Sequence, residues 1–163
     1  MLREDGVGLR VTESSDFLYR EDPAHPGWHS WNLADDTRFN AQTMGHMLVR
    51  IEDERTCRVR MFPEHRHTNL LDIVHGAVTL ALMDVSLFAA IRTLLKGDAG
   101  GSLTLELSSQ FIGAGKPGVP LDAVVEVMRE TGRMVFLRGR VVQGEDDALI
   151  AGFSGIVRKP SRK

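Results

Sequence analysis

Residues 75–95 read HGAVTLALMDVSLFAAIRTLL, and this stretch decides the fold. A helix with this sequence is apolar on nearly every face, which predicts that it is buried rather than lying on a surface. Two features are unusual for such a helix. A His75-Gly76 pair opens it without an ordinary capping side chain, and one carboxylate, Asp84, lies in its middle. Because a buried carboxylate is costly unless it is paired or functional, we expect this helix to be both core and active-site scaffold.

Length and composition indicate one ordinary globular domain. The chain has 163 residues, enough to bury a sizeable core without disulfides, and 26% of them are charged. A net charge of −2 gives no support for nucleic-acid binding. The N-terminus lacks the apolar run of a signal peptide, and the helix is too short and too interrupted by Asp84 for a membrane span. We therefore expect a cytoplasmic enzyme or binding protein, with neither nucleic acid nor membrane as a partner.

Segments of alternating polarity lie on both sides of the helix. Before it, residues 47–51 and 56–61 flank a polar turn and predict a β-hairpin, with the single cysteine, Cys57, as a core residue rather than a nucleophile. After it, four further strands are expected, separated by turns that contain glycine: 103–112, 121–129, 134–142 and 149–158. Short connections of this kind predict an antiparallel sheet.

Two details of these elements follow from their residue types. Leu103, Leu105 and Leu107 alternate with polar residues, so one face of their strand is expected to be buried. At the end of the helix, Gly97 is expected to adopt the left-handed conformation that closes many helices. Because a flat sheet cannot cover a helix that is apolar all round, we expect an α+β fold. In it, a curved antiparallel β-sheet wraps around one long central helix, and a second subunit covers what remains.

The remaining residues are expected to be additions to this domain, which spans residues 44–158. Residues 1–43 contain both tryptophans, Trp28 and Trp31, and are predicted to be an extension that packs on the domain or across a subunit boundary. Within it, residues 31–39 suggest a short helix capped by Asn32. Residues 159–163 form a basic tail.

The spacing of polar residues around the helix start is the most informative pattern in the chain. Asn69 lies six residues before His75, Gly76 follows, and Asp84 comes nine residues after His75. This pattern, at the start of a buried helix that precedes an antiparallel sheet, resembles hotdog-fold acyl-CoA thioesterases. More narrowly, it resembles the phenylacetic-acid-degradation (PaaI-like) branch of the 4-hydroxybenzoyl-CoA thioesterase superfamily. Ala77 stands where that family usually has a second glycine.

The resemblance implies a catalytic role for several of these residues. In such enzymes the thioester carbonyl docks at the helix start, where the Gly76 N–H and the helix dipole stabilise the developing oxyanion and Asn69 donates a hydrogen bond. Asp84, contributed by the partner subunit, serves as general base or nucleophile. Its position fits this sharing, because Asp84 lies about 12 Å along the helix axis from Gly76 of its own chain. The resemblance thus implies an obligate homodimer, or a dimer of dimers (a homotetramer).

Further residues are assigned by the same resemblance. Thr104 falls where some relatives carry a hydroxyl that helps to position the water, and His75 is expected to orient the helix start. Coenzyme A phosphates are expected near exposed basic residues; the candidates are Arg133, Arg138 or Arg140, and Arg158 with the tail that follows it. No metal or redox cofactor is implied, and coenzyme A enters only as part of the substrate. His65 and His67 match no zinc signature.

Other functions stay open at this point. The leading hypothesis is hydrolysis of a small or aromatic acyl-CoA to the acid and free coenzyme A, with residues 28–31 as a possible wall of the acyl pocket. A non-catalytic acyl-CoA-binding hotdog protein and an acyl-carrier-protein thioesterase are alternatives, since fold alone does not fix function. A hotdog dehydratase would need a differently spaced helix start. Plain structural roles also exist: Asp84 satisfied by nearby hydroxyls, Asn69 in a turn, and Thr104 as an ordinary strand residue.

Overall fold

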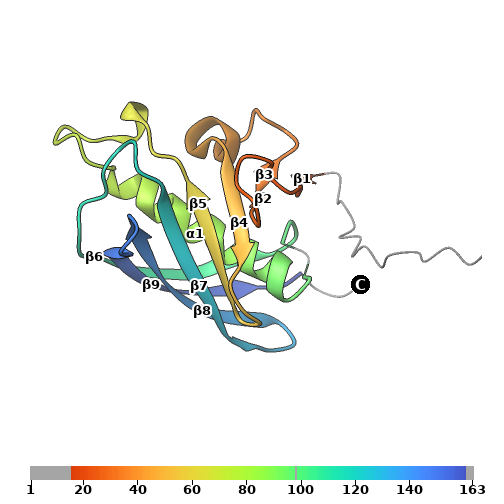
Figure 1. Cartoon of the computed structure of the whole chain (residues 1–163). Helices are drawn as coiled ribbons and strands as arrows, with labels where there is room; N and C mark the ends of the chain where they lie inside the picture. Colours follow the sequence, from red (N-terminus) through yellow and green to blue (C-terminus); the bar gives the residue numbers. More distant parts are fainter. Residues whose placement is uncertain (1–15, 98, 161–163) are drawn as a thin grey trace, which may run out of the picture.

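A curved antiparallel sheet wraps around one long helix in the computed structural model, which describes residues 16–97 and 99–160 (Figure 1). The helix is α1 (Gly76–Leu94). Within the described residues the main sheet has seven strands, ordered β2 (His29–Ser30), β4 (Met47–Ile51), β5 (Thr56–Met61), β7 (Leu121–Glu130), β8 (Met134–Gln143), β9 (Ala148–Arg158) and β6 (Leu103–Phe111). Every neighbouring pair is antiparallel. The predicted hotdog architecture is confirmed.

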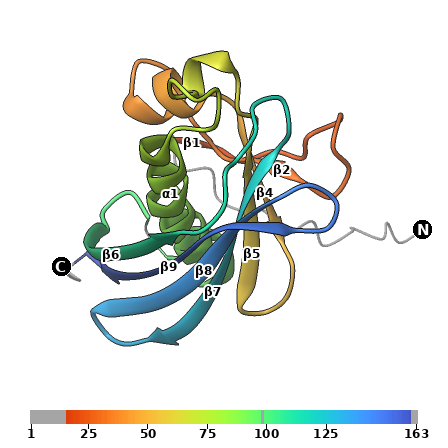
Figure 2. The ribbon, with the colours of Figure 1, turned by 90° about the vertical axis from the view of Figure 1, so that its left-hand side faces the viewer.

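The sheet covers the helix because its strands alternate as the sequence indicates. In β5, Cys57, Val59 and Met61 are fully buried, while the arginines between them point to the outer face. Figure 2 shows the strands curving around α1 on one side. At β9 the approach is close: a Cβ added to Gly155 would lie 2.6 Å from the Cδ1 atom of Leu87. Glycine at this position therefore lets the helix settle onto the sheet.

The end of the helix differs from the prediction. The left-handed residue is Lys96, with φ of 51°, and not Gly97. The Gly97 N–H donates to the Ile91 carbonyl at 3.1 Å, and a Cβ on Gly97 would lie 2.9 Å from the Cγ2 atom of Ile91. Gly97 is therefore needed because the chain passes close to the last turn of the helix, and not because it adopts a left-handed conformation.

The expected helix over residues 31–39 is absent and that prediction is wrong. Instead, β3 (Asn32–Leu33) pairs with β1 (Phe17–Leu18), and a short π-helix, η1 (Asn40–Met44), follows. Asn32 does not cap a helix. Its side-chain carbonyl accepts the Met47 N–H at 3.0 Å, so the amide fixes the start of β4.

Residues 16–46, which we call the N-terminal segment, are held on the domain by both tryptophans. Trp28 lies between two guanidinium groups, with Arg50 4.5 Å and Arg60 4.4 Å from its ring centroid. Trp31 is buried, and its backbone N–H donates to the Met47 carbonyl at 2.8 Å. Residues 1–15 and 161–163, which belong to the predicted extension and tail, lie outside the described residues.

Among the strands of residues 16–97 and 99–160, β6 pairs with β9 alone and lies at an open edge of the sheet. The expectation that its leucine face is buried is wrong for the single chain, since Leu103 is 53% and Leu105 51% exposed. Two causes are visible. An edge strand has sheet on one side only, and a bulge between Thr104 and Glu106 interrupts the alternation.

By length and composition alone, α1 is apolar enough to cross a membrane, but more than half of it is buried inside this fold. That burial is the ordinary situation of a core helix.

The outer face of the sheet carries a buried charge network. Asp122, 4% exposed, accepts hydrogen bonds from Arg60 at 2.7 Å and from Arg58 at 3.1 Å. The nearby pair of Arg138 and Glu126, at 2.8 Å, has side chains 59% and 37% exposed. Removing one partner of a buried ion pair leaves the other charges uncompensated, whereas exposed pairs contribute little.

Asp122→Ala is therefore expected to lower the free energy of unfolding by about 3–5 kcal/mol, measured by urea denaturation. Glu126→Ala, on the same strand, is the matched control and should change it by less than about 1 kcal/mol. Equal losses in the two variants would contradict this assignment of the network.

Candidate active site at the central helix

The start of α1 presents a backbone donor. His75 is the N-cap: its carbonyl accepts the N–H groups of Val78 and Thr79 at 2.9 and 3.2 Å. Among the hydrogen bonds of the described residues, none uses the Gly76 N–H. A Cβ on Gly76 would lie 3.5 Å from the ring of Phe111, a half-exposed residue at the end of β6. The first N–H of the helix thus lies at the positive end of its dipole, and the Phe111 ring lies beside Gly76.

His75 caps the helix through its side chain. Its Nδ1 atom accepts the Ala77 N–H at 2.9 Å. A neutral imidazole that accepts at Nδ1 carries its proton at Nε2, so the outward nitrogen is a donor. His75 is therefore arranged to orient the helix start, and its outer nitrogen is not placed as a base.

Asn69 lies in the loop directly before the helix. The ends of this loop are joined by an antiparallel bridge between Thr68 and Val74. The Asn69 side-chain carbonyl accepts the Leu71 N–H at 2.9 Å, which is the turn role that Asn commonly plays. The same bond leaves the NH2 group of Asn69 as the part of the side chain that is open to a ligand.

Asp84 and Thr104, both assigned to the site by the resemblance, are hydrogen-bonded to each other. The Thr104 hydroxyl, from β6, donates to Asp84 Oδ1 at 2.7 Å. Asp84 was expected to be buried, but it is only partly so. It reaches a cavity of about 210 Å³. A carboxylate oriented by one hydroxyl and open to a cavity is arranged to accept a proton from a water molecule held there.

Most residues of this cavity were not identified from the sequence. Its lining consists of Phe17, Trp31, Leu33, Asn40, Asp84, Val85, Phe88 and Ala99. Of the two tryptophans considered for an acyl pocket, Trp31 lines the cavity and Trp28 lies instead among the arginines of the outer face. Phe88 was identifiable, because it lies one helical turn after Asp84 and therefore on the same face. Phe17, Leu33 and Asn40 carry no such signal, since tertiary packing alone places them.

The predicted residues fall into two groups within one chain. Asn69, His75 and Gly76 lie at the helix start, whereas Asp84 and Thr104 lie two turns further on. The structure describes one chain, in which these groups do not meet; the axial separation of Gly76 and Asp84 is about 12 Å.

The predicted phosphate-binding arginines also differ in their surroundings. Arg138 is engaged with Glu126 at 2.8 Å. Arg158 lies at the end of β9, opposite both Leu103 and Met134, so it shares one end of the sheet with Arg133 and with the start of β6. Both Arg133 and Arg158 are exposed.

Two further possibilities considered from the sequence are the Cys57 thiol as a nucleophile and histidines as metal ligands. Burial raises the pKa of the Cys57 thiol to about 12, which keeps it neutral. Both ring nitrogens of His67 are used, by the Glu64 N–H at 2.8 Å and by the Thr43 carbonyl at 2.7 Å. Over residues 16–97 and 99–160, no group of three or more metal-ligating side chains is found.

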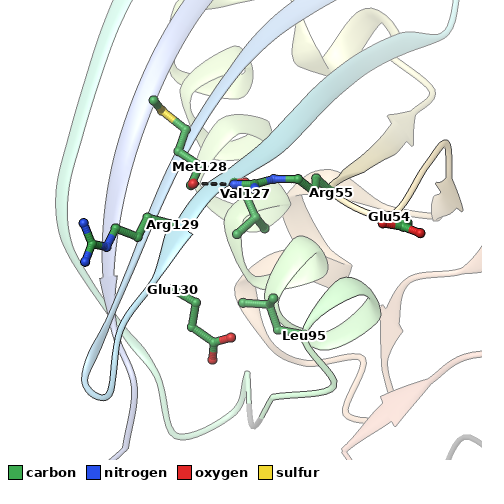
Figure 3. Close-up of a pocket in the computed structure, with 7 residues that line it drawn as sticks. All are labelled: Glu54, Arg55, Leu95, Val127, Met128, Arg129 and Glu130. Carbon is green, nitrogen blue, oxygen red and sulfur yellow. Dashed lines mark hydrogen bonds between the residues drawn. The ribbon is translucent and has the colours of Figure 1, made fainter.

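A second cavity, of about 340 Å³, lies near the end of the helix and contains none of the predicted residues (Figure 3). Arg55 extends across it and donates to the carbonyls of Val127, at 2.9 Å, and Met128. The guanidinium is therefore committed to the backbone of β7, and the cavity offers no comparable catalytic pair.

Comparison with known proteins agrees with this fold. Residues 71–150 match the family model described as Thioesterase superfamily. Among solved structures, zebrafish thioesterase superfamily member 2 is similar, with a TM-score of 0.68 and 20% identity over 77% of this chain and 89% of that chain. The Escherichia coli PaaI protein of the phenylacetic acid degradation operon is also similar, with a TM-score of 0.61 and 19% identity over 73% of this chain and 86% of that chain. For a mutant thioesterase enzyme from Staphylococcus aureus, the TM-score is 0.63 and the identity 17% over 76% of this chain and 100% of that chain.

No curated protein sequence matches the chain. At these identities the solved structures establish the fold, and the family match covers the helix and the strands that carry Asp84 and Thr104. The solved structures thus establish the hotdog fold, and residues 71–150 match the thioesterase superfamily model.

Proposed function

We propose that this protein is an acyl-CoA thioesterase, which hydrolyses a small or aromatic acyl-CoA to the free acid and coenzyme A. The match of residues 71–150 to the thioesterase superfamily model supports a thioester hydrolase in general. The observation that carries the finer proposal is the hydrogen bond from Thr104 to Asp84, 2.7 Å long, in a cavity whose other lining residues are apolar except Asn40. A binding protein has no need for an oriented carboxylate beside its apolar ligand.

The proposed reaction uses the two groups of residues at once. Asp84 takes a proton from a water molecule whose oxygen attacks the thioester carbonyl carbon. Alternatively, the Asp84 carboxylate attacks that carbon, and water hydrolyses the mixed anhydride that remains after the thiolate has left. The Gly76 N–H and the Asn69 amide hold the oxyanion, at the positive end of the helix dipole. Collapse of the tetrahedral intermediate breaks the carbon–sulfur bond, and coenzyme A leaves as the thiolate, which then takes up a proton.

This reaction requires two chains. Gly76 and Asp84 of one helix are too far apart to act on the same carbonyl, so two antiparallel copies must each supply one group. The open edge of β6 is the surface we propose for this pairing. It presents unpaired backbone groups beside exposed Leu103, Leu105 and Phe111. The loop that carries Asn69 adds Leu70, which is fully exposed. The assembly is then a homodimer, or a dimer of such dimers.

The phosphates of coenzyme A are proposed to lie near Arg133 and Arg158. These two exposed arginines share the end of the sheet where β6 begins, and Thr104 is the second residue of that strand. Arg138 is less suited, because it is already paired with Glu126. No metal or further cofactor enters this proposal, and a cytoplasmic location stays a prediction.

The first test measures thiol release from a panel of acyl-CoA esters. Asp84→Asn should lower kcat/KM by about 100-fold or more, because the amide cannot act as a base. Asp36→Asn removes the same charge from an exposed position and should leave the rate unchanged. If wild-type protein binds acyl-CoA and releases no thiol from any ester, the enzyme proposal fails and the binding alternative takes its place.

The second test concerns Thr104 as a positioning residue. Thr104→Val keeps the shape of the side chain but removes the hydroxyl that orients Asp84. A hydrogen bond to a charged group is worth enough to lower kcat by about tenfold, with KM nearly unchanged. Thr104→Ser retains the donor and should restore most of kcat. Full kcat in the valine variant would exclude this role.

The third test concerns subunit pairing. Leu105→Glu places a charge at the middle of the proposed interface and should give a monomer in sedimentation velocity, with loss of thiol release. Met128→Glu is the matched control, because Met128 is 47% exposed but lies on β7, away from β6. A Leu105→Glu variant that remains dimeric and active would contradict pairing through β6.

A further inference from the structure

The cavity beside Asp84 has two walls of different origin. Asp84, Val85 and Phe88 come from one face of the central helix. The opposite wall is formed by Phe17, Trp31, Leu33 and Asn40, which all belong to the N-terminal segment. Apart from Asp84 and Asn40, the lining is apolar. The shape therefore suits an apolar group whose reactive end lies at the carboxylate.

The wall from the N-terminal segment is held rigidly in place. Strand pairing sets Phe17 directly opposite Leu33, and the Phe17 ring stacks on Trp31 with 5.0 Å between the ring centroids. Trp31 is 2% exposed and its N–H is bonded to β4. The guanidinium of Arg92, from the helix, also lies 4.7 Å from the Phe17 ring centroid. This wall is preformed, so it limits the space beside Asp84 rather than adapting to what enters it.

The size of the cavity sets the scale of its occupant. An apolar cavity of about 150 Å³ accommodates benzene, so about 210 Å³ accommodates one ring or a chain of similar bulk with little to spare. A chain of twelve carbons is too bulky to lie wholly within this space. Phe17 and Leu33 belong to the wall contributed by the N-terminal segment, and their bulk limits the space on that side.

We infer that the N-terminal segment is the acyl-length determinant of this protein, with Phe17 and Leu33 forming the stop against which the end of the acyl group rests. This inference rests on the proposed thioesterase function. It adds a property that the family match does not supply, because that match begins at residue 71 and the stop lies within residues 16–46. Acyl preference is then set by residues outside the matched region.

The experiment compares hexanoyl-CoA with dodecanoyl-CoA in thiol-release assays of wild type, Phe17→Ala and Leu33→Ala. In wild type, kcat/KM should favour hexanoyl-CoA. Each alanine variant should raise the dodecanoyl-to-hexanoyl ratio by about tenfold or more, since a few methylenes in an apolar pocket discriminate on this scale. Leu18→Ala is the matched control: Leu18 follows Phe17 on the same strand but is exposed and outside the lining. Its ratio should stay that of wild type.

A binding measurement separates this inference from the proposed function. The non-hydrolysable thioethers S-hexyl-CoA and S-dodecyl-CoA are titrated calorimetrically into the same four proteins. If no thioester is hydrolysed but Phe17→Ala and Leu33→Ala selectively gain affinity for S-dodecyl-CoA, the thioesterase proposal fails and the length determinant stands. If thiol is released but the length ratio is the same in all four proteins, the determinant is overturned and the thioesterase proposal stands. Equal affinities in every protein, without hydrolysis, would overturn both.

Discussion

The structure depends on covering a helix that has no polar face. Most of α1 would otherwise expose apolar surface to water, and burying each such side chain contributes on the order of 1.5–3 kcal/mol. The sheet meets this need by curving, with inward residues such as Val59 and Met61 against the helix. Where the sheet ends, Trp31 from the N-terminal segment completes the cover. The curvature and the packed N-terminal segment thus answer one requirement, and the open edge beside β6 is what a single chain leaves uncovered.

The parts of the fold that could be predicted are those in which local pattern and tertiary packing agree. The central helix, the hairpin of β4 and β5, and the later strands follow from periodicity and turn residues, and their predicted boundaries fall within one or two residues of those observed. Asp84 was identifiable because it is a carboxylate in the middle of an apolar helix, whereas Thr104 was named only through the family resemblance. Asn32 shows the limit. Asparagine is favoured as a helix cap, but in the structure the Asn32 side-chain carbonyl accepts the N–H of Met47 at the start of β4. The local sequence does not reveal this long-range hydrogen bond.

The bulge in β6 bears on two features of this strand, the exposed leucines and the hydrogen bond from Thr104 to Asp84. Strict alternation would place Leu103, Leu105 and Leu107 on one buried face. The register shift between Thr104 and Glu106 breaks that pattern, and such shifts re-aim side chains near functional sites. Here the hydroxyl of Thr104 reaches Asp84, while Leu105 faces outward. The bulge therefore contributes both to the contact of Thr104 with Asp84 and, together with the edge position, to the exposure of the leucines; no residue type in this strand indicates the bulge.

The open edge of β6 also has a consequence for how the protein is made. A strand of nine residues with one free edge and exposed leucines can template pairing with any extended chain nearby. Proline and charged residues discourage such pairing, and the strand has no proline and one charge, Glu106. Its other polar residues near the middle are Ser108, Ser109 and Gln110. A nascent chain that folds alone carries an aggregation-prone edge until that edge is covered. Under the proposed pairing of subunits, solubility during expression would depend on protein concentration and on how fast two chains meet.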